Sequence, residues 1–175
     1  MTLVRAKQVG DVAVFFDGCS SPHKHDFAGY AVTVKDECSD VNGSPRYCSF
    51  GSLHPNATNN EAEFYGLIEA LDVAERLLIG AVNSQERFNV HIKGDSRIVI
   101  DAYNRGRVRA SNLQPLLERC LDYKHRWSNR ITVTWCEREK NLAGHYIGRN
   151  RAVMKQKYLR GRLRKGSFAV GKLPL

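Results

Sequence analysis

The sequence predicts an α/β fold built around a mixed sheet, and three features of the chain support this prediction. Short apolar runs with turn residues between them fill the first third of the 175-residue chain. From residue 62 onward the apolar spacing changes to that of an amphipathic helix. Strand-like runs then alternate with helical segments. We therefore expect a five-stranded mixed sheet, with three antiparallel strands, two further strands and helices on both faces.

Three strands are expected first. Residues 11–16 form an apolar, β-branched and aromatic run that reaches Asp17-Gly18, a turn pair, so this strand would carry an aspartate at its end. Residues 28–34 and 46–53 read as the second and third strands, with a polar turn between them. These strands are expected to pair as an antiparallel meander.

The rest of the chain is expected to alternate helices with strands. In chain order, the segments are a helix from Ala62 to a C-cap near Gly80, a strand at 88–92, a helix at 97–103, a helix capped by Asn112 with Pro115 in its first turn, a strand at 131–135, and a helix from about Asn141 past Ala152. Asp95 closely follows the fourth strand.

Three acidic residues in this arrangement are candidates for a metal site. Asp17 and Asp95 end strands, and Glu63 lies in the first turn of the long helix, so the three carboxylates meet if the first and fourth strands are neighbours. Converging carboxylates are the ligands that Mg²⁺ and Mn²⁺ prefer in phosphodiester chemistry. Each residue also has a structural explanation: a turn at Asp17, a helix N-cap at Asp95, and a capping box between Asn60 and Glu63.

Four motifs, in their order and spacing, resemble those of type 1 ribonuclease H. They are Phe15-Phe16-Asp17-Gly18, Ala28-Gly29-Tyr30-Ala31-Val32, Thr58-Asn59-Asn60-Glu61-Ala62-Glu63 and Gly94-Asp95-Ser96. The third, at the start of a helix, is the most specific. The resemblance covers nearly the whole chain up to Ala152, and it implies the RNase H-like fold.

The resemblance also implies a function. It implies a metal-dependent endoribonuclease that cuts the RNA strand of RNA–DNA hybrids with two Mg²⁺ (or Mn²⁺) ions and a water nucleophile. Asp17, Glu63 and Asp95 would hold the metal ions.

The resemblance further implies a set of contacts with the nucleic acid. Asn59 and Asn60 would touch the hybrid in its minor groove, where an amide can both donate to and accept from a 2′-hydroxyl. Thr58 is a candidate phosphate contact, and Ser96 beside Asp95 is a further expected contact.

The chain departs from the family pattern at the fourth carboxylate. The family usually has an aspartate in an Asn-x-x-Ala-Asp stretch, whereas this chain ends the stretch Asn141-Leu142-Ala143-Gly144-His145 with a histidine. His145 is a candidate catalytic residue and metal ligand through a neutral imidazole. The alternative, a polar helix residue without a ligand role, stays open, and so does weakened activity.

Two loops differ as well. The segment from Cys19 to Phe27 carries Ser20, Ser21, His23 and His25 where the family often has a glycine-rich run with a substrate-binding asparagine. Residues 136–140 contain no glycine–histidine loop, which places the chain nearer the compact members of the family.

Positive charge is concentrated at the C-terminus. Lys and Arg number 27 against 18 Asp and Glu, and residues 149–175 hold nine basic residues and no acidic one. We expect an RNase H-like domain at 1–155 and a basic extension at 156–175, with Arg149 and Arg151 contacting phosphates. A solvated tail is the alternative. Arg105, Arg107 and Arg109 are a second candidate phosphate contact, or a solvated basic loop.

Composition limits the remaining possibilities. The five cysteines are odd in number and show no C-x-x-C pair, which argues against a disulfide framework or a zinc site. With no signal-peptide pattern and no long apolar run, we expect an intracellular, non-secreted protein that does not contact membranes, with a monomer favoured. The expected partner is an RNA–DNA hybrid, or another duplex. Two other functions stay open: a catalytically inactive nucleic-acid-binding domain, and a scaffold within a larger assembly.

Overall fold

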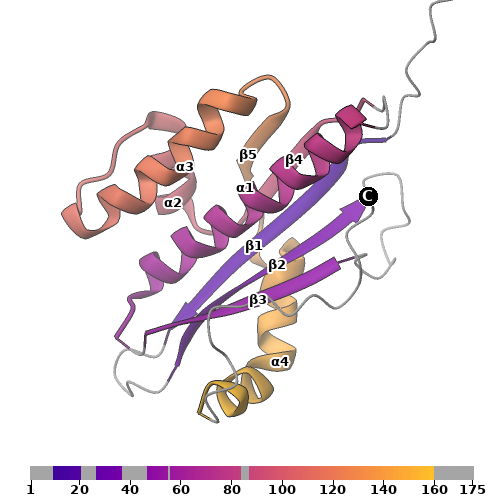
Figure 1. Ribbon diagram of the computed structural model, residues 1–175. Helices are drawn as coiled ribbons and strands as arrows, with labels where there is room; N and C mark the ends of the chain where they lie inside the picture. The colour runs from indigo at the N-terminus through magenta and orange to yellow at the C-terminus, as the bar shows by residue number, and fades with distance from the viewer. Residues whose placement is uncertain (1–9, 21–26, 37–46, 55, 84–86, 160–175) are drawn as a thin grey trace, which may run out of the picture.

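The computed structural model describes residues 10–20, 27–36, 47–54, 56–83 and 87–159. It has one five-stranded sheet with the strand order β3-β2-β1-β4-β5 (Figure 1). The strands are β1 (Val12–Ser20), β2 (Ala28–Asp36), β3 (Tyr47–Leu53), β4 (Val90–Gly94) and β5 (Ile131–Trp135).

Strand pairing follows the expected scheme. β1, β2 and β3 form an antiparallel meander, whereas β4 lies parallel to both β1 and β5. The ladder between β1 and β4 pairs Val12 with Val90 and Phe15 with Lys93. The expectation that the first and fourth strands are neighbours is therefore confirmed.

Helices cover both faces of the sheet (Figure 1). They are α1 (Asn59–Asn83), α2 (Arg97–Arg105), α3 (Gln114–Trp127) and α4 (Leu142–Leu159), with short 3-10 turns at Ser111–Leu113 and Arg138–Lys140. Val14 and Phe16 of β1 belong to the core that contains α1 and α3, whereas Ala13 and Phe15 pack with Ala143 of α4. This alternation is the period of two that a strand buried on both faces requires.

Two element ends differ from the sequence-based expectation. β1 does not end at Asp17 but continues to Ser20, because Gly18 still pairs with Tyr30 of β2 and Ser20 with Ala28. α1 passes through Gly80 to Asn83. The cost of a glycine inside a helix, about 1 kcal/mol relative to alanine, is small beside the burial of the residues around it.

The structure forms neither the expected Asn112 cap nor the capping box that was the alternative explanation for Glu63. α3 begins at Gln114 after a 3-10 turn, and no described side chain caps it; the Asn112 amide instead donates to Glu61 Oε1 at 3.4 Å. At the start of α1, the capping box joins Thr58 to Glu61 rather than Asn60 to Glu63: the Thr58 amide donates to Glu61 Oε2 at 2.7 Å, and the Glu61 amide donates to Thr58 Oγ1 at 3.2 Å. Glu63 is therefore left free of any capping role.

The predicted boundary after residue 155 falls inside α4, which runs to Leu159. Residues 160–175, most of the predicted basic extension, lie outside the described residues, so the division into domain and extension stays a prediction. Within the described chain, none of the helices combines the length and the apolar character that a membrane crossing needs.

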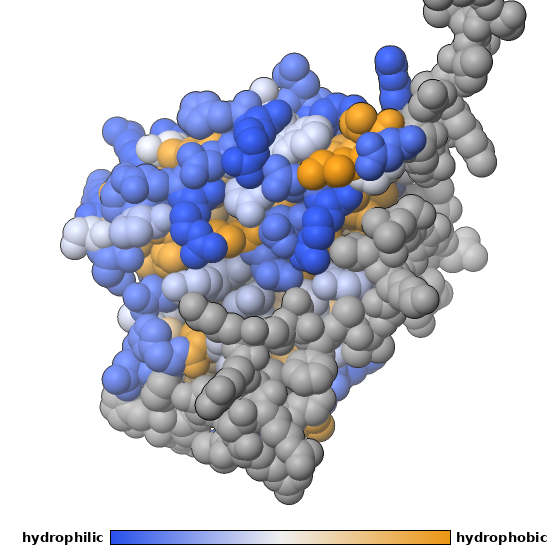
Figure 2. All heavy atoms as spheres, viewed as in Figure 1, coloured by the Kyte–Doolittle hydropathy of each residue, from blue (hydrophilic) through white to orange (hydrophobic). Residues whose placement is uncertain are grey.

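The visible surface over α1 and α3 is mainly hydrophilic (Figure 2). Hydrophobic side chains gather near the C-terminal end of α1 in this view, where Ile79 and Val82 are exposed. Ile98, Trp135 and Val153 are further exposed large hydrophobic residues. Trp135 closes β5 and therefore lies at the end of the sheet where Asp95 follows β4.

Gly18 allows α1 to begin directly against β1. A Cβ atom at residue 18 would overlap the backbone of Ala62 and the amide nitrogen of Glu63. Backbone atoms cannot turn aside as a flexible side chain can, so only glycine fits this contact without a shift of α1. The position of Glu63 relative to β1 thus depends on the missing side chain at residue 18.

We predict that Gly18→Ala lowers the free energy of unfolding by about 1–3 kcal/mol or more, because the added methyl group must displace the start of α1. Gly80→Ala is the matched control, since a Cβ atom there would meet no atom within 4 Å. That control should stabilise the protein by about 0.5–1 kcal/mol through helix propensity. Urea denaturation of the two variants measures both changes; equal effects would contradict the proposed contact.

Candidate active site

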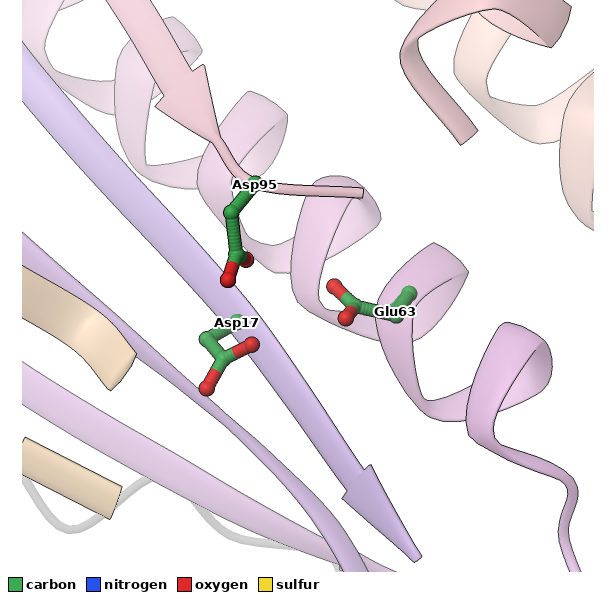
Figure 3. A group of neighbouring side chains, drawn as sticks. All are labelled: Asp17, Glu63 and Asp95. Carbon is green, nitrogen blue, oxygen red and sulfur yellow. The ribbon is translucent and has the colours of Figure 1, made fainter. Parts of the chain in front are cut away.

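Three carboxylates from separate elements converge at one end of the sheet. Asp17 comes from β1, Asp95 directly follows β4, and Glu63 lies near the start of α1 (Figure 3). One ligand oxygen from each residue lies within 4.8 Å of the others. The parallel pairing of β1 with β4 brings the two aspartates together, and the contact at Gly18 brings Glu63 to them.

Burial makes this cluster electrostatically unfavourable on its own. Asp17 is 2% exposed and Glu63 5% exposed. Burial, together with the negative charges of the neighbouring carboxylates, raises the pKa of Asp17 to about 7 and that of Glu63 to about 9. Among the described residues, neither Asp17 Oδ1 nor Glu63 Oε2 has a hydrogen-bond partner. Buried oxygens without donors are costly, so the cluster favours an added cation.

The geometry and chemistry of the cluster fit a divalent metal ion. Oxygen ligands of one Mg²⁺ ion lie about 3–4 Å apart, because each bond is about 2.1 Å long. The observed spread of up to 4.8 Å needs only small side-chain movements to reach this range. Asp17, Glu63 and Asp95 would hold the ion, and their hard oxygens match Mg²⁺ or Mn²⁺.

Asn141 fixes one side of the Asp95 carboxylate. Its side-chain amide donates to Asp95 Oδ1 at 3.0 Å and to the carbonyl oxygen of Phe16 at 2.9 Å. Its own Oδ1 accepts a hydrogen bond from the Ala143 amide at 3.2 Å, at the start of α4. Asn141 is fully buried, so this one side chain ties β1, Asp95 and α4 together.

Trp135 and Arg138 contact Asp95 from the side of β5. The Trp135 indole N–H donates to the Asp95 carbonyl oxygen at 3.1 Å, and Arg97 stacks its guanidinium on the indole ring at 4.2 Å. Arg138 Nη1 lies 3.2 Å from Asp95 Oδ2. Positive charge therefore lies directly beside the acidic cluster.

His145 lies on α4 next to the cluster but does not join it. The preceding residue, Gly144, approaches the Asp17 carboxylate so closely that a Cβ atom there would lie 3.3 Å from Asp17 Oδ2. His145 itself is exposed, and the group of converging ligand atoms found among the described residues does not include its ring. The structure thus leaves both interpretations of His145 open, and its role as a ligand stays a prediction.

The expected nucleic-acid contacts at the start of α1 lie beside the cluster. Thr58 and Asn59 are exposed, and Asn60 is half-buried. The Thr58 hydroxyl donates to Glu61 Oε2 at 2.9 Å, so part of its hydrogen-bonding capacity is used by the capping box. Asn59 and Asn60 are the first two residues of α1, where backbone N–H groups favour anions.

Asn60 also lines a cavity of about 540 Å³ between α1, α2 and the loop before α3. The other lining residues are Ile98, Asp101, Ala102, Arg105, Arg107, Val108, Arg109, Ala110 and Leu113. The three arginines that the sequence singled out therefore share one concave surface with Asn60. The rest of the lining is apolar except for Asp101, whose Oδ2 lies 3.4 Å from Arg105 Nη2, so Arg107 and Arg109 are the arginines of this surface without an acidic partner in its lining.

The remaining expected contacts are more scattered. Ser96 is half-buried at the N-cap of α2 and makes no side-chain capping bond. Arg149 and Arg151 are exposed on α4. Burial raises the pKa of the Cys19 thiol to about 11, and the positive charge of Arg151 opposes this rise. Ser21, His23 and His25 lie outside the described residues.

The sequence did not single out Arg138, Trp135 or the contact of Asn141 with Asp95. Asn141 was visible as a helix start and as the first residue of the stretch that resembles the family's Asn-x-x-Ala-Asp pattern, whereas Arg138 lies in an unremarkable charged segment. Their contacts with Asp95 join residues that are 40 to 46 positions apart in the sequence. One weak signal existed: an asparagine just before a helix close to a predicted metal site has a side chain that can both cap and donate.

Comparisons with known proteins agree with this architecture. The family model described as reverse transcriptase-like matches residues 15–149, well over half of the chain. LC11-RNase H1, isolated from compost by a metagenomic approach, is 20% identical, with a TM-score of 0.64, and the match covers 79% of this chain and 93% of that one.

Two further solved structures are similar. The N-terminal RNase H domain of a Mycobacterium tuberculosis protein is 23% identical, with a TM-score of 0.63, over 87% of this chain and 99% of that one. LC11-RNase H1 in complex with an RNA/DNA hybrid matches at 21% identity and a TM-score of 0.60, over 75% of this chain and 89% of that one. At these identities the structural likeness establishes the fold, and the family match establishes the relationship. The chain belongs to the reverse transcriptase-like family and has the RNase H-like fold of the type 1 enzymes in their compact form.

Proposed function

We propose that this protein is a metal-dependent endoribonuclease that hydrolyses the RNA strand of RNA–DNA hybrids. The observation that carries the proposal is the convergence of Asp17, Glu63 and Asp95. Two of them, Asp17 and Glu63, are buried and have an oxygen for which the described part of the chain supplies no hydrogen-bond partner. A cluster of this kind is costly to the fold unless it serves to bind a cation.

The chemistry follows from the ligands. Divalent ions bound here would activate a water molecule and neutralise charge on the scissile phosphate. Asp17, Glu63 and Asp95 hold the ions, while Asn141 keeps the Asp95 carboxylate in a fixed orientation through its bonds to Oδ1 and to β1. Trp135 fixes the backbone of Asp95 through the hydrogen bond from its indole to the Asp95 carbonyl oxygen. The number of ions, two, and their identity, Mg²⁺ or Mn²⁺, are part of the proposal.

Selectivity for the hybrid would come from the start of α1. Asn59 and Asn60 offer amides that can donate to and accept from ribose 2′-hydroxyls, which only an RNA strand has. The cavity beside Asn60, with Arg105, Arg107 and Arg109 in its lining, would hold backbone phosphates of the second strand. LC11-RNase H1, which shares the fold, has been solved with an RNA/DNA hybrid.

A second candidate function is hybrid binding without cleavage. It is favoured by one observation: the place of the fourth carboxylate is held by His145, which is exposed and outside the converging group. In that case the protein would bind the same substrate with little or no turnover.

Cleavage of a labelled hybrid, double-stranded RNA and double-stranded DNA, each with Mg²⁺ and with Mn²⁺, distinguishes the two functions. We expect cleavage of the RNA strand of the hybrid alone. Asp95→Asn should reduce it roughly 100-fold or more, because a metal ligand is lost. Asp122→Asn, the same change on the exposed surface of α3, is the control and should have no effect. The enzymatic function would be ruled out by two results together: the hybrid stays uncut, and Asp95→Asn changes neither the metal affinity nor the binding of the hybrid.

The raised pKa values predict how stability changes with pH. Asp17 and Glu63 have folded-state pKa values of about 7 and about 9, above the ordinary values of 3.8 and 4.5, so the folded state holds protons that the unfolded chain has lost. Without metal, the free energy of unfolding should therefore fall as the pH rises from about 4 to about 9. Asp17→Asn should flatten this decline.

Urea denaturation in EDTA at several pH values measures this slope, and Asp122→Asn again serves as the control. Addition of Mn²⁺ should restore stability, increasingly so at higher pH, since metal binding needs ionised carboxylates. An identical slope in Asp17→Asn and the unmodified protein would show that the cluster does not titrate as inferred.

His145→Asp tests the fourth position. Because Gly144 lies against Asp17, a carboxylate at residue 145 should add charge beside the cluster and increase both Mn²⁺ affinity and cleavage, by roughly tenfold. The control is His125→Asp on the exposed face of α3. Unchanged metal affinity in His145→Asp would mean that the side chain at this position does not reach the site.

A further inference from the structure

Arg138 occupies a distinctive place at the acidic cluster. It is the first residue of the 3-10 turn that follows β5, and its Nη1 lies 3.2 Å from Asp95 Oδ2. The two partners differ sharply in exposure: the Arg138 side chain is 77% exposed, whereas the Asp95 side chain is 8% exposed. A fixed carboxylate is thus paired with a side chain that has room to move.

Asp95 is held in place without Arg138. Asn141 donates to its Oδ1, and the Trp135 indole donates to its backbone carbonyl oxygen. Arg138 donates at 3.2 Å to Oδ2, the carboxylate oxygen to which Asn141 does not donate. Removal of the guanidinium should therefore free Oδ2 without releasing the Asp95 side chain.

The charge of Arg138 reaches the whole cluster. It favours the ionised forms of Asp17 and Glu63, opposing the effect of burial on the pKa of each, and it pairs directly with Asp95. A divalent ion among these carboxylates would meet the same positive charge at short range, and like charges in a partly buried site repel strongly. The guanidinium and a metal ion therefore compete for the same negative charge.

We propose that Arg138 is a resident counter-ion that competes with divalent metal ions for Asp95, so that it must leave this carboxylate when metal binds. The inference rests on the proposed metal site and deepens it, by adding a residue that lowers the affinity of the site for metal in the free protein. Arg138 also stabilises the carboxylates of the metal-free protein. Its exposed side chain can then turn to the anionic substrate.

The test is a calorimetric titration of Mn²⁺ into the full chain without nucleic acid, which measures the dissociation constant for Mn²⁺. Arg138→Gln should bind Mn²⁺ roughly three- to tenfold more tightly than the unmodified protein, and Arg138→Lys, which keeps the charge, should stay close to it. In EDTA, Arg138→Gln should unfold at a lower urea concentration, because the carboxylates lose their counter-ion.

The matched control is Arg76→Gln. Arg76 is paired with Asp72 at 2.6 Å on α1, and the helix rise places it about 20 Å from Glu63. Arg76→Gln removes the same charge from an ion pair, but far from the acidic cluster. It should therefore leave the Mn²⁺ affinity unchanged.

The outcomes separate this inference from the proposed function. Equal or weaker Mn²⁺ binding by Arg138→Gln would overturn the role of Arg138 while leaving the metal site intact. An equal gain in Arg76→Gln would also overturn it, since the effect would then be one of net charge. If the unmodified protein binds no Mn²⁺, the metal site itself fails.

Discussion

The parallel pairing of β1 with β4 is the constraint on which the site depends. It places Asp17 and Asp95 side by side although 78 residues separate them in the chain. The pairing is held by the core between the sheet and α1, in which Val14, Phe16 and Ile92 are fully buried. Because that core is continuous, it can tolerate the repulsion between buried carboxylates at the end of the sheet. The apolar core covers the ladder between β1 and β4, and the unfavourable charge of Asp17 and Asp95 lies just beyond its last pair, Phe15 and Lys93.

The start of α1 shows how the chain separates local structure from the site. Glu61 and Glu63 are two residues apart, which on a helix turns their side chains about 200° from each other. Glu61 closes the capping box with Thr58, so α1 can begin without help from Glu63. Glu63 can then be buried against β1, where Gly18 leaves room for the helix backbone. A single acidic residue could not have done both.

Much of this could be predicted from the sequence, and the exceptions have physical reasons. The change in apolar period near Ala62 indicated where the meander ends and α1 begins, and the motif order indicated which carboxylates converge. The end of β1 could not be predicted, because Asp17-Gly18 is a turn pair locally, whereas continued pairing with β2 keeps it in the strand. Thr58–Glu61 and Asn60–Glu63 share the same spacing, so spacing could not choose the cap. The contacts of Arg138 and Asn141 with Asp95 are tertiary, so the local sequence around Asn141 gave only a weak signal and that around Arg138 gave none.

Two side chains act in the same direction on the charge of the site. His145 stands where a carboxylate is usual, and Arg138 brings a guanidinium to Asp95, so the site is less negative than four carboxylates would make it. The deep part, Asp17 and Glu63, still has buried oxygens without donors and still favours a cation. The outer part, Asp95, already has donors from the protein. Under our proposal, cation affinity is adjusted at the outer part, where the Arg138 side chain is exposed, and not in the buried part, where any change would also disturb the fold.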